Sequence, residues 1–204
     1  RDFVFLPELY AAETYIAGRM ALILSSYPDL GQAYDRQIDA LQEQLGITYE
    51  SRQRRAITMA LNNGVFILTG GPGTGKTTII NAIIELFEQR GDKVMLAAPT
   101  GRAAKRMSEL TGRQSKTIHR LLEVDFRDGA GTVFKRDERN TLPADVIVVD
   151  EMSMVDTLLF QSLLRAMKLG CRLVMVGDTD QLPSVGPGNV LKDLIEADVI
   201  PTVH

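Results

Sequence analysis

The fold is decided by residues 70–78, Gly-Gly-Pro-Gly-Thr-Gly-Lys-Thr-Thr, which carry the spacing G-x-x-x-x-G-K-[ST]. The apolar run 65–68 before this stretch predicts a buried strand, and the isoleucines after it recur at helical spacing. A loop between a strand and a helix can turn its backbone N–H groups inward around phosphate oxygens. These flanks argue against a glycine-rich loop without a phosphate role. We therefore predict a nucleotide-binding loop made by Gly71, Pro72, Gly73, Thr74, Gly75, Lys76, Thr77 and Thr78.

Two side chains of this loop have specific chemistry. Lys76 can bring a positive charge to the β- and γ-phosphates of a nucleotide, and the hydroxyl of Thr77 can bind Mg²⁺. The predicted ligands are therefore ATP and Mg²⁺. We assign Lys76 a catalytic role in addition to its binding role, and we assign Thr77 to the metal.

The composition indicates a globular chain. Its 204 residues suit one large domain, or one domain and an appendage, and 45% hydrophobic residues support a packed core. No run approaches the roughly 18 apolar residues of a membrane span, and no signal peptide heads the sequence. We therefore expect a cytoplasmic protein with no membrane partner. The single cysteine, Cys171, cannot form an internal disulfide, and we predict a packed thiol.

The charge is unevenly distributed along the chain. The net charge of −3 argues against a uniformly basic surface for nucleic acid. Residues 101–120 nevertheless hold a local excess of basic side chains, with Glu109 as their only acidic residue. Alone, this segment would be interpreted as a solvated helix face, whereas beside the other motifs it is a candidate contact for a polyanion. Its basic residues are Arg102, Lys105, Arg106, Arg113, Lys116 and Arg120.

Predicted strands and helices alternate over most of the sequence, which is typical of an α/β fold with a mainly parallel sheet. Residues 7–26 and 32–45 show apolar side chains at helical spacing but no visible chemistry. We assign residues 1–48 to a helical N-terminal segment. Residues 49–204 form the predicted nucleotide-binding domain, which begins with a helix over 49–63.

Polar groups follow the predicted strands at their carboxyl ends, where α/β sheets bind ligands. One buried strand is followed by Asp150 and Glu151, and the next strand leads into Gln181. Asp150 fits as a Mg²⁺ ligand together with Thr77, while Glu151 can deprotonate an attacking water molecule. Gln181 is a neutral hydrogen-bonding group that can report whether the nucleotide is intact. An isolated Asp-Glu pair would be an ordinary acidic turn, but the phosphate loop upstream favours the catalytic interpretation.

Two further positions are candidates for ligand contacts. Gln53 lies on the helix before the phosphate loop, and its amide offers a donor and an acceptor together, as contact with N6 and N7 of adenine requires. A surface glutamine is the alternative. Thr100 follows another buried strand, where its hydroxyl and the next N–H groups can hold a phosphate. Thr117 is a predicted helix N-cap.

Residues 123–142 interrupt the alternation of strands and helices. Two short β-like runs, 124–126 and 132–135, flank a glycine-rich turn. We predict a β-hairpin that projects from the main sheet. A disordered surface loop is the alternative.

Read together, six stretches resemble, in order, the first-half motifs of RecD-like superfamily 1 DNA helicases. The resemblance covers Tyr49 to Leu191, and the wording of DEMSMVD and GDTDQLPSVGPG is far more specific than a nucleotide-binding loop alone. The six stretches are QRRAI (53–57), GGPGTGKTT (70–78), APTGRAAKRM (98–107), TIHRLL (117–122), VIVVDEMSMVD (146–156) and VMVGDTDQLPSVGPGNVL (174–191).

This resemblance implies a RecA-like P-loop domain and ATP-driven 5′ to 3′ movement on single-stranded DNA, with unwinding at duplex junctions. It implies that Gln53 reads adenine, that Gln181 couples the nucleotide state to DNA, and that the hairpin is a pin-like insertion that helps to separate strands. Members of this class act alone or as subunits of helicase–nuclease complexes, and both arrangements remain open. The residues implied along single-stranded DNA are Thr100, Arg102, Thr117 and His119.

The resemblance concerns the first motor half of these enzymes. We do not find the motifs of the second RecA-like domain or its arginine finger, a group worth ~10³ or more in rate. We therefore expect helicase activity in a longer parent protein, and weak ATP binding with poor hydrolysis by these residues alone. Three alternatives remain: a clamp or remodelling ATPase on the same fold, a nucleotide-gated nucleic-acid-binding module that does not unwind, and RNA in place of DNA.

Overall fold

The computed structural model describes residue 4 and residues 6–126 and 131–204. Its centre is a six-stranded sheet with the strand order β3-β2-β6-β7-β1-β8, in which every neighbouring pair is parallel. The predicted α/β fold with a mainly parallel sheet is therefore confirmed. The strands are β1 (Val65–Thr69), β2 (Val94–Ala98), β3 (Ser115–Thr117), β6 (Val146–Val149), β7 (Arg172–Gly177) and β8 (Thr202–Val203).

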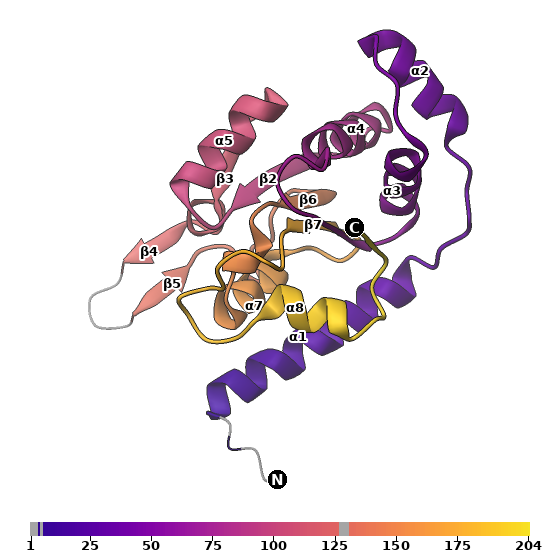
Figure 1. Ribbon diagram of the computed structural model, residues 1–204. Helices are drawn as coiled ribbons and strands as arrows, with labels where there is room; N and C mark the ends of the chain where they lie inside the picture. Colours follow the sequence, from indigo (N-terminus) through magenta and orange to yellow (C-terminus); the bar gives the residue numbers. More distant parts are fainter. Residues whose placement is uncertain (1–3, 5, 127–130) are drawn as a thin grey trace.

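Helices cover both faces of this sheet (Figure 1). Alternate residues of each strand reach the two resulting cores, so that Ile67 packs in one core while Phe66 and Leu68 pack in the other. Burial on both faces explains why the strands are unbroken apolar runs in the sequence. The first core is covered by α1 (Pro7–Ser26), α6 (Ile118–Leu121), α7 (Thr157–Ala166) and α8 (Val190–Glu196), and the second by α2 (Asp35–Leu45), α3 (Ser51–Asn62), α4 (Lys76–Gln89) and α5 (Gly101–Thr111).

The two N-terminal helices pack on opposite faces of the sheet. Ile16 and Met20 of α1 belong to the same core as α7, whereas Ile38 of α2 belongs to the core that contains α3 and α4. The helix predicted over 7–26 is confirmed, while α2 begins at Asp35, later than predicted, and ends at Gly46 in the left-handed conformation. The boundary between residues 48 and 49 stays a prediction. No helix in the described part of the chain is long and apolar enough to cross a membrane.

The lone cysteine lies inside the fold. Cys171 is a free, buried thiol, and burial raises its pKa to about 12. A thiol with so high a pKa carries almost no thiolate at neutral pH and is a poor nucleophile. The predicted packed, unreactive thiol is therefore confirmed.

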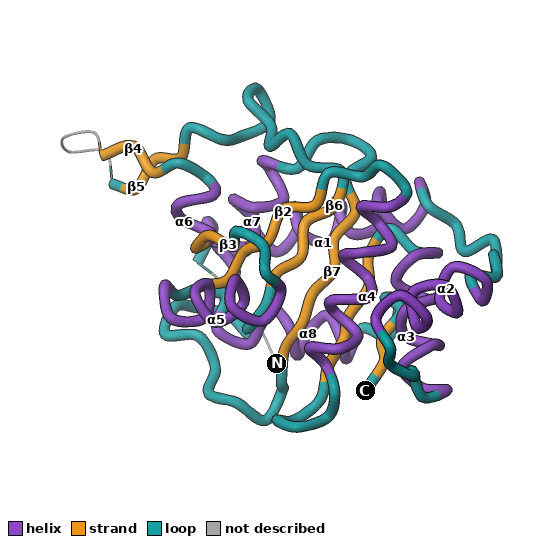
Figure 2. The backbone as a smooth tube through the Cα atoms, turned by 90° about the horizontal axis from the view of Figure 1, so that it is seen from above, coloured by secondary structure: helices purple, strands orange, loops and turns teal. Residues whose placement is uncertain are grey.

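The predicted hairpin is confirmed as a separate two-stranded sheet. Strands β4 (Val124–Phe126) and β5 (Thr132–Phe134) pair antiparallel and project from the side of the main sheet (Figure 2). The base of the hairpin is held by Glu123, whose carbonyl accepts from the N–H of Lys135 at 3.0 Å and whose carboxylate pairs with Arg136 at 3.0 Å. Residues 127–130 of the predicted turn at 127–131 lie outside the described residues.

The loop after β7, residues 178–189, is held against the start of α7. The N–H of Thr157 donates to the carbonyl of Pro187 at 3.1 Å. A Cβ atom on Gly186 would lie 2.2 Å from the carboxylate of Asp156, and one on Gly188 would lie 1.9 Å from the Thr157 hydroxyl. Gly188 also has a φ of 96°. Both glycines therefore let the loop approach the start of α7 closely. We call this contact of Gly186 and Gly188 with Asp156 and Thr157 the loop clasp, and it positions the segment that contains Gln181.

We expect Gly188→Ala to lower the free energy of unfolding by about 1–3 kcal/mol, because the new Cβ atom would collide with Thr157 in a strained backbone conformation. Gly18→Ala is the matched control. Gly18 is an exposed residue of α1 with no atom near its Cβ position, and alanine favours a helix over glycine by about 1 kcal/mol. Urea unfolding compares the three proteins. A Gly188→Ala variant as stable as the unchanged protein would contradict the clasp.

Candidate active site

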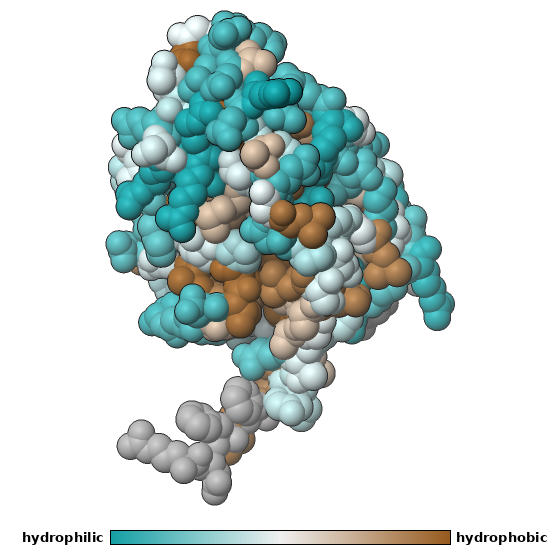
Figure 3. Space-filling view, turned by 90° about the vertical axis from the view of Figure 1, so that its right-hand side faces the viewer, coloured by the Kyte–Doolittle hydropathy of each residue, from teal (hydrophilic) through white to brown (hydrophobic). Residues whose placement is uncertain are grey.

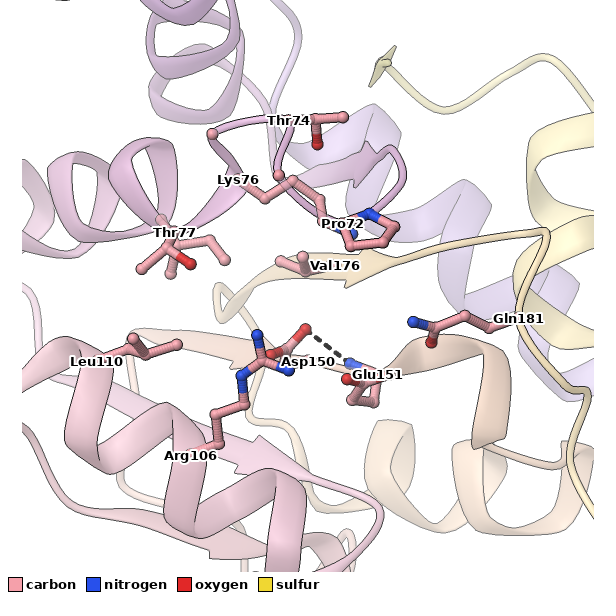
Figure 4. A pocket seen from close by; sticks show the side chains of 13 residues that line it. Pro72, Thr74, Lys76, Thr77, Arg106, Leu110, Asp150, Glu151, Val176 and Gln181 are labelled. Carbon is pink, nitrogen blue, oxygen red and sulfur yellow. Dashed lines mark hydrogen bonds between the residues drawn. The ribbon is translucent and has the colours of Figure 1, made fainter.

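The carboxyl ends of β1, β6 and β7 meet at a cavity of about 300 Å³. Strand β7 lies between β1 and β6 in the sheet, so the loop after β1 faces the acidic end of β6 across one strand. Figure 4 shows Lys76, Asp150 and Gln181 around this cavity. It is lined by Pro72, Gly73, Thr74, Gly75, Lys76, Thr77, Ile80, Arg106, Leu110, Asp150, Glu151, Val176 and Gln181.

Glycines give the loop after β1 its shape. Gly70, Gly73 and Gly75 have φ values of 149°, 77° and 79°, which side-chain-bearing residues rarely adopt. The hydroxyl of Thr74 donates to the carbonyl of Gly71 at 2.7 Å, and the ammonium group of Lys76 donates to the carbonyl of Gly70. The loop is therefore closed around the Lys76 side chain. Helix α4 begins at Lys76, so the positive end of its dipole lies at the cavity.

Two carboxyl groups line the opposite wall. Oδ1 of Asp150 accepts from the N–H of Glu151 at 2.8 Å. Burial raises the pKa of Asp150, although this hydrogen bond and the charges of Lys76 and Arg106 act against it. Burial also raises the pKa of Glu151, and the neighbouring charge of Asp150 adds to the effect. A raised pKa makes a carboxylate a better proton acceptor at neutral pH, which suits a general base.

The backbone at Glu151 is in a conformation that is uncommon for a residue with a side chain. Its φ is 53°, in the left-handed region that costs of order 1–3 kcal/mol for residues other than glycine. This backbone turns the chain sharply where β6 ends. Side chains of both Asp150 and Glu151 consequently line the same cavity.

The remaining predicted nucleotide contacts lie at different places. Gln181 reaches the cavity from the loop after β7 (Figure 4). Gln53 does not line the cavity: its side-chain carbonyl accepts from the N–H of Glu50 at 2.9 Å in the capping box that begins α3. Its amide nitrogen lies beside the phosphate loop, 3.0 Å from the position of a Cβ atom on Gly75. Gly71 and Thr78 are in the loop or on α4 but outside the cavity lining.

The predicted DNA contacts lie near neighbouring strand ends, outside this cavity. Thr100 follows β2 and Thr117 ends β3, which pairs with β2. Each of their hydroxyls caps a helix, accepting at 3.2 Å from the N–H of Ala103 and of Arg120, respectively. The predicted N-cap at Thr117 is therefore confirmed, and both hydroxyls already have a partner within the protein.

Arg102 and His119 complete this set. Arg102 is exposed on the first turn of α5. The ring of His119 lies beside that of Phe134 in the hairpin, with centroids 5.8 Å apart. Both rings line a second cavity of about 370 Å³, which α7 also borders.

The basic segment 101–120 is not one continuous patch. Arg113 turns toward α4, where it pairs with Glu85 at 2.6 Å and with Glu88 at 2.8 Å. These ion pairs raise the pKa of Arg113 and fasten the end of α5 to α4. Arg113 is therefore engaged within the protein, while the contact of this segment with a polyanion stays a prediction.

Two residues at the active site were not assigned from the sequence. Arg106 lines the cavity from α5, although the sequence analysis grouped it with the surface charges. Asp178 is 6% exposed and has one carboxylate oxygen 4.0 Å from the Cβ position of Gly71. The other oxygen accepts from the N–H of Asp180 at 2.9 Å, which shapes the turn before Gln181. A polar residue directly after a buried strand was a usable signal for Asp178, as it was for Asp150.

A third cavity, of about 230 Å³, is unsuited to phosphate. It lies between α1 and α8 and is lined by Ile16, Ala17, Val190 and Leu194, with Glu13, Thr157 and Asp193 but no basic residue. Figure 3 shows the side of the molecule that has α2 at the top and the ends of α1 and α8 lower down. Apolar residues gather in the lower part of this face. The cavity at β1, β6 and β7 combines the phosphate loop with two basic and two acidic side chains, and it is the candidate active site.

The two aspartates that flank β6, Asp145 before it and Asp150 after it, have pKa shifts of opposite direction that can be tested. The pKa of Asp150 is raised in the folded protein, so its ionised form opposes folding above that pKa. We expect Asp150→Asn to be more stable than the unchanged protein at pH 7, and this gain should vanish below the ordinary aspartate pKa of about 4. Urea unfolding at several pH values measures it. A destabilised Asp150→Asn variant at pH 7 would contradict this account.

The control is Asp145, just before β6. Its carboxylate accepts from the N–H of Lys93 at 2.7 Å and from Lys168 at 3.0 Å, and these bonds lower its pKa. Its stabilising contribution is therefore present above the unfolded pKa and is lost as the pH falls through the folded pKa. Asp145→Asn should thus destabilise the protein at pH 7, opposite to Asp150→Asn.

The chain is similar to several characterised proteins. It is 38% identical over 194 residues to the ATP-dependent RecD2 DNA helicase of Deinococcus radiodurans, covering 95% of this chain and 26% of that protein. It is 35% identical over 221 residues to the RecBCD enzyme subunit RecD of Mycobacterium tuberculosis, covering 95% of this chain and 36% of the subunit. The corresponding subunit of Mycolicibacterium smegmatis is 37% identical, with 96% and 38% covered. The chain thus spans well under half the length of these relatives.

Solved structures support the same fold. Bacteroides Pif1 bound to single-stranded DNA matches with a TM-score of 0.50 and 25% identity, over 75% of this chain and 37% of Pif1. Pif1 helicase from Candida albicans matches with a TM-score of 0.50 and 29% identity, over 69% of this chain and 34% of that protein. The sheet and its helices therefore form a RecA-like P-loop NTPase domain.

A family model described as an AAA domain matches residues 53–187. This range contains the phosphate loop, both acidic residues after β6 and the loop with Gln181. It leaves out α1 and α2, which the structure nevertheless packs on the two faces of the sheet. The chain belongs to this AAA-domain family and is a homologue of the RecD and RecD2 helicase proteins.

Proposed function

We propose that this chain is the first motor domain of an ATP-dependent 5′ to 3′ DNA helicase that moves along single-stranded DNA and unwinds duplex junctions. The observation that carries the proposal is the convergence of the phosphate loop, two acidic side chains and Gln181 on one cavity. Similarity to proteins named as RecD, RecD2 and Pif1 helicases supports DNA as the nucleic acid. Because the chain spans 26% of the RecD2 protein, unwinding is proposed for a longer protein.

The triphosphate is proposed to lie between the phosphate loop and the acidic end of β6. The N–H groups of residues 73–77 would hold its β-phosphate, while Lys76 would exchange the Gly70 carbonyl for phosphate oxygens. Gln53 is beside this loop and would contact adenine through the side-chain nitrogen that its helix-capping bond leaves free.

The donor set also fits Mg²⁺. Thr77 and Asp150 both line the cavity and offer oxygen atoms, which Mg²⁺ prefers. Asp150 keeps Oδ2 available because Oδ1 accepts from Glu151. Within the described part of the chain, no three His, Cys, Asp or Glu residues gather as a metal site, and Mg²⁺ commonly needs only one or two protein ligands beside phosphates and water. When bound, the ion would neutralise charge on the phosphates.

Glu151 is the proposed general base and Gln181 the proposed sensor of the terminal phosphate. Glu151 would accept a proton from the attacking water, for which its raised pKa is favourable. Gln181 would form a hydrogen bond with the terminal phosphate and would lose it when that phosphate is removed. The loop clasp holds the loop that contains Gln181 against α7. A displacement of Gln181 would therefore also displace the start of α7.

Single-stranded DNA is proposed to follow the strand ends beyond β2 and β3. Thr100 and Thr117 would position it through the N–H groups of the helix starts that they cap. Arg102 would contact a phosphate, and His119 would lie toward the hairpin, the proposed strand-separating element. The proposed protein partners are the other subunits of a helicase–nuclease complex, since relatives are named as RecBCD subunits. A cytoplasmic location accords with a DNA substrate.

We expect Lys76→Ala to weaken binding of a non-hydrolysable ATP analogue with Mg²⁺ by at least about tenfold, since it removes a charge-assisted contact to phosphate. Isothermal titration calorimetry on this chain measures the affinity. Lys192→Ala is the control, because Lys192 is exposed on α8 and pairs only weakly with Glu196, at 3.8 Å. An affinity unchanged by Lys76→Ala would remove the nucleotide assignment.

We expect Arg102→Ala to weaken binding of single-stranded DNA and to reduce the slope of log affinity against log salt by about one, as loss of one phosphate contact predicts. Fluorescence anisotropy over a salt series measures this slope. Arg36→Ala, in an exposed position on α2, is a control of equal charge. Equal slopes for Arg102→Ala and Arg36→Ala would place Arg102 on an ordinary solvated surface.

A further inference from the structure

Arg106 is a cation of the active-site cavity to which the proposed function gives no role. It extends from α5, and its guanidinium group points toward Asp150 from the side opposite the phosphate loop (Figure 4). Lys76 and Thr77 line the cavity from the other wall. The two cations therefore approach one space from two different elements.

The charge balance of the cavity depends on Arg106. The ionisable groups that line it are Lys76, Arg106, Asp150 and Glu151, two positive and two negative. The buried Asp178 lies just behind the phosphate loop and adds negative potential at Glu151. Without Arg106, Lys76 and the proposed Mg²⁺ would be left to offset three carboxyl groups and the phosphates of the ligand. Electrostatics therefore give Arg106 a role in ligand binding.

No interaction with the described residues explains why an arginine occupies position 106. Within residues 4, 6–126 and 131–204, no hydrogen bond or ion pair involves its guanidinium group. Its neighbours on the same segment differ: Arg113 pairs with Glu85 and Glu88, and Lys105 reaches Glu109 at 4.0 Å. A guanidinium group with five donors and no partner, at a cavity made for phosphates, is available for a ligand.

The position within the cavity indicates which part of the ligand it meets. The phosphate loop and the start of α4 occupy the end that would hold the β-phosphate. Arg106 lies instead on the wall of the cavity made by α5, where its guanidinium group faces Asp150 at the end of β6 (Figure 4). Gln181 lines the same cavity and lies beside Glu151 (Figure 4). In the proposed arrangement this is where the terminal phosphate lies.

We propose that Arg106 binds the terminal phosphate of the nucleotide from the α5 side of the cavity, opposite Lys76. This inference rests on the proposed nucleotide site. Arg102 belongs to the same helix, one turn earlier. Helix α5 would then carry one side chain to the terminal phosphate and another to single-stranded DNA, which makes it a direct physical link between the two ligands.

The test compares two nucleotides on this chain. Calorimetry with Mg²⁺ gives the affinities for a non-hydrolysable ATP analogue and for ADP, which lacks the terminal phosphate. We expect Arg106→Ala to weaken the analogue by about tenfold, equivalent to about 1.4 kcal/mol, and ADP by less than about twofold. Lys105→Ala, one position away, exposed and outside the cavity lining, should change neither affinity.

The outcomes separate the two proposals. If the unchanged chain binds neither nucleotide, the proposed function itself fails and the inference falls with it. If the unchanged chain binds both nucleotides, the effect of Arg106→Ala on each affinity decides the role of Arg106. An equal loss of affinity for both nucleotides, or no loss for either, overturns that role but leaves the proposed function standing. Thermal unfolding checks that the variant is folded. Should Arg106→Ala unfold, Arg106→Gln retains length and polarity, and it must show the same selective loss.

Discussion

Parallel pairing of β6, β7 and β1 is the constraint on which the rest of the structure depends. Parallel strands bring their carboxyl ends to one edge of a sheet, so the segments that follow them meet there, however far apart they are in the sequence. The register aligns Leu68 with Val176 and Val149 with Met175. The phosphate loop, Asp150 and the Gln181 loop therefore leave the sheet at nearly the same height. A cavity with both cations and carboxylates follows from that alignment.

The site contains buried carboxyl groups and a strained backbone, and both act against folding. Burial raises the pKa of Asp150 and of Glu151, so both ionised groups oppose folding at neutral pH. Glu151 adds backbone strain, with its φ of 53°. The sheet can tolerate this because its strands are buried on both faces: Val148 and Val149, the last residues of β6, have no exposed surface. Rigid apolar strands thus hold charged groups in positions that they would not adopt alone.

Two elements connect the nucleotide cavity to other surfaces. The loop clasp presses Gly186 and Gly188 onto the start of α7, and α7 borders the cavity that contains His119 and Phe134. Helix α5 provides the second connection, since it lies over β2 and β3 and reaches the nucleotide cavity through Arg106. The loop clasp consists of closely packed backbone, which suits the transmission of a small displacement, whereas α5 reaches the cavity with a long side chain.

The sequence by itself determined the local structure and the identity of the chemical groups. The phosphate loop, the buried strands and the helix cap at Thr117 all depend on residues close together in the chain. Caps, turns and apolar periodicity are local signals, so they can be recognised without knowing the fold. The resemblance to RecD-like helicases added roles for residues that local patterns alone leave ambiguous.

Only the tertiary structure decided how side chains from one segment are divided among different tasks. Arg106 and Arg113 are both basic residues near the same helix, yet Arg106 faces the nucleotide cavity while Arg113 pairs with Glu85 and Glu88. The difference depends on where α5 lies relative to α4 and to β6, a consequence of strand order rather than of local pattern. The clasp has the same origin, because Gly188 meets Thr157 only after β6 and β7 pair. Contacts between distant segments are set by packing of the whole sheet, and no short stretch of sequence encodes them.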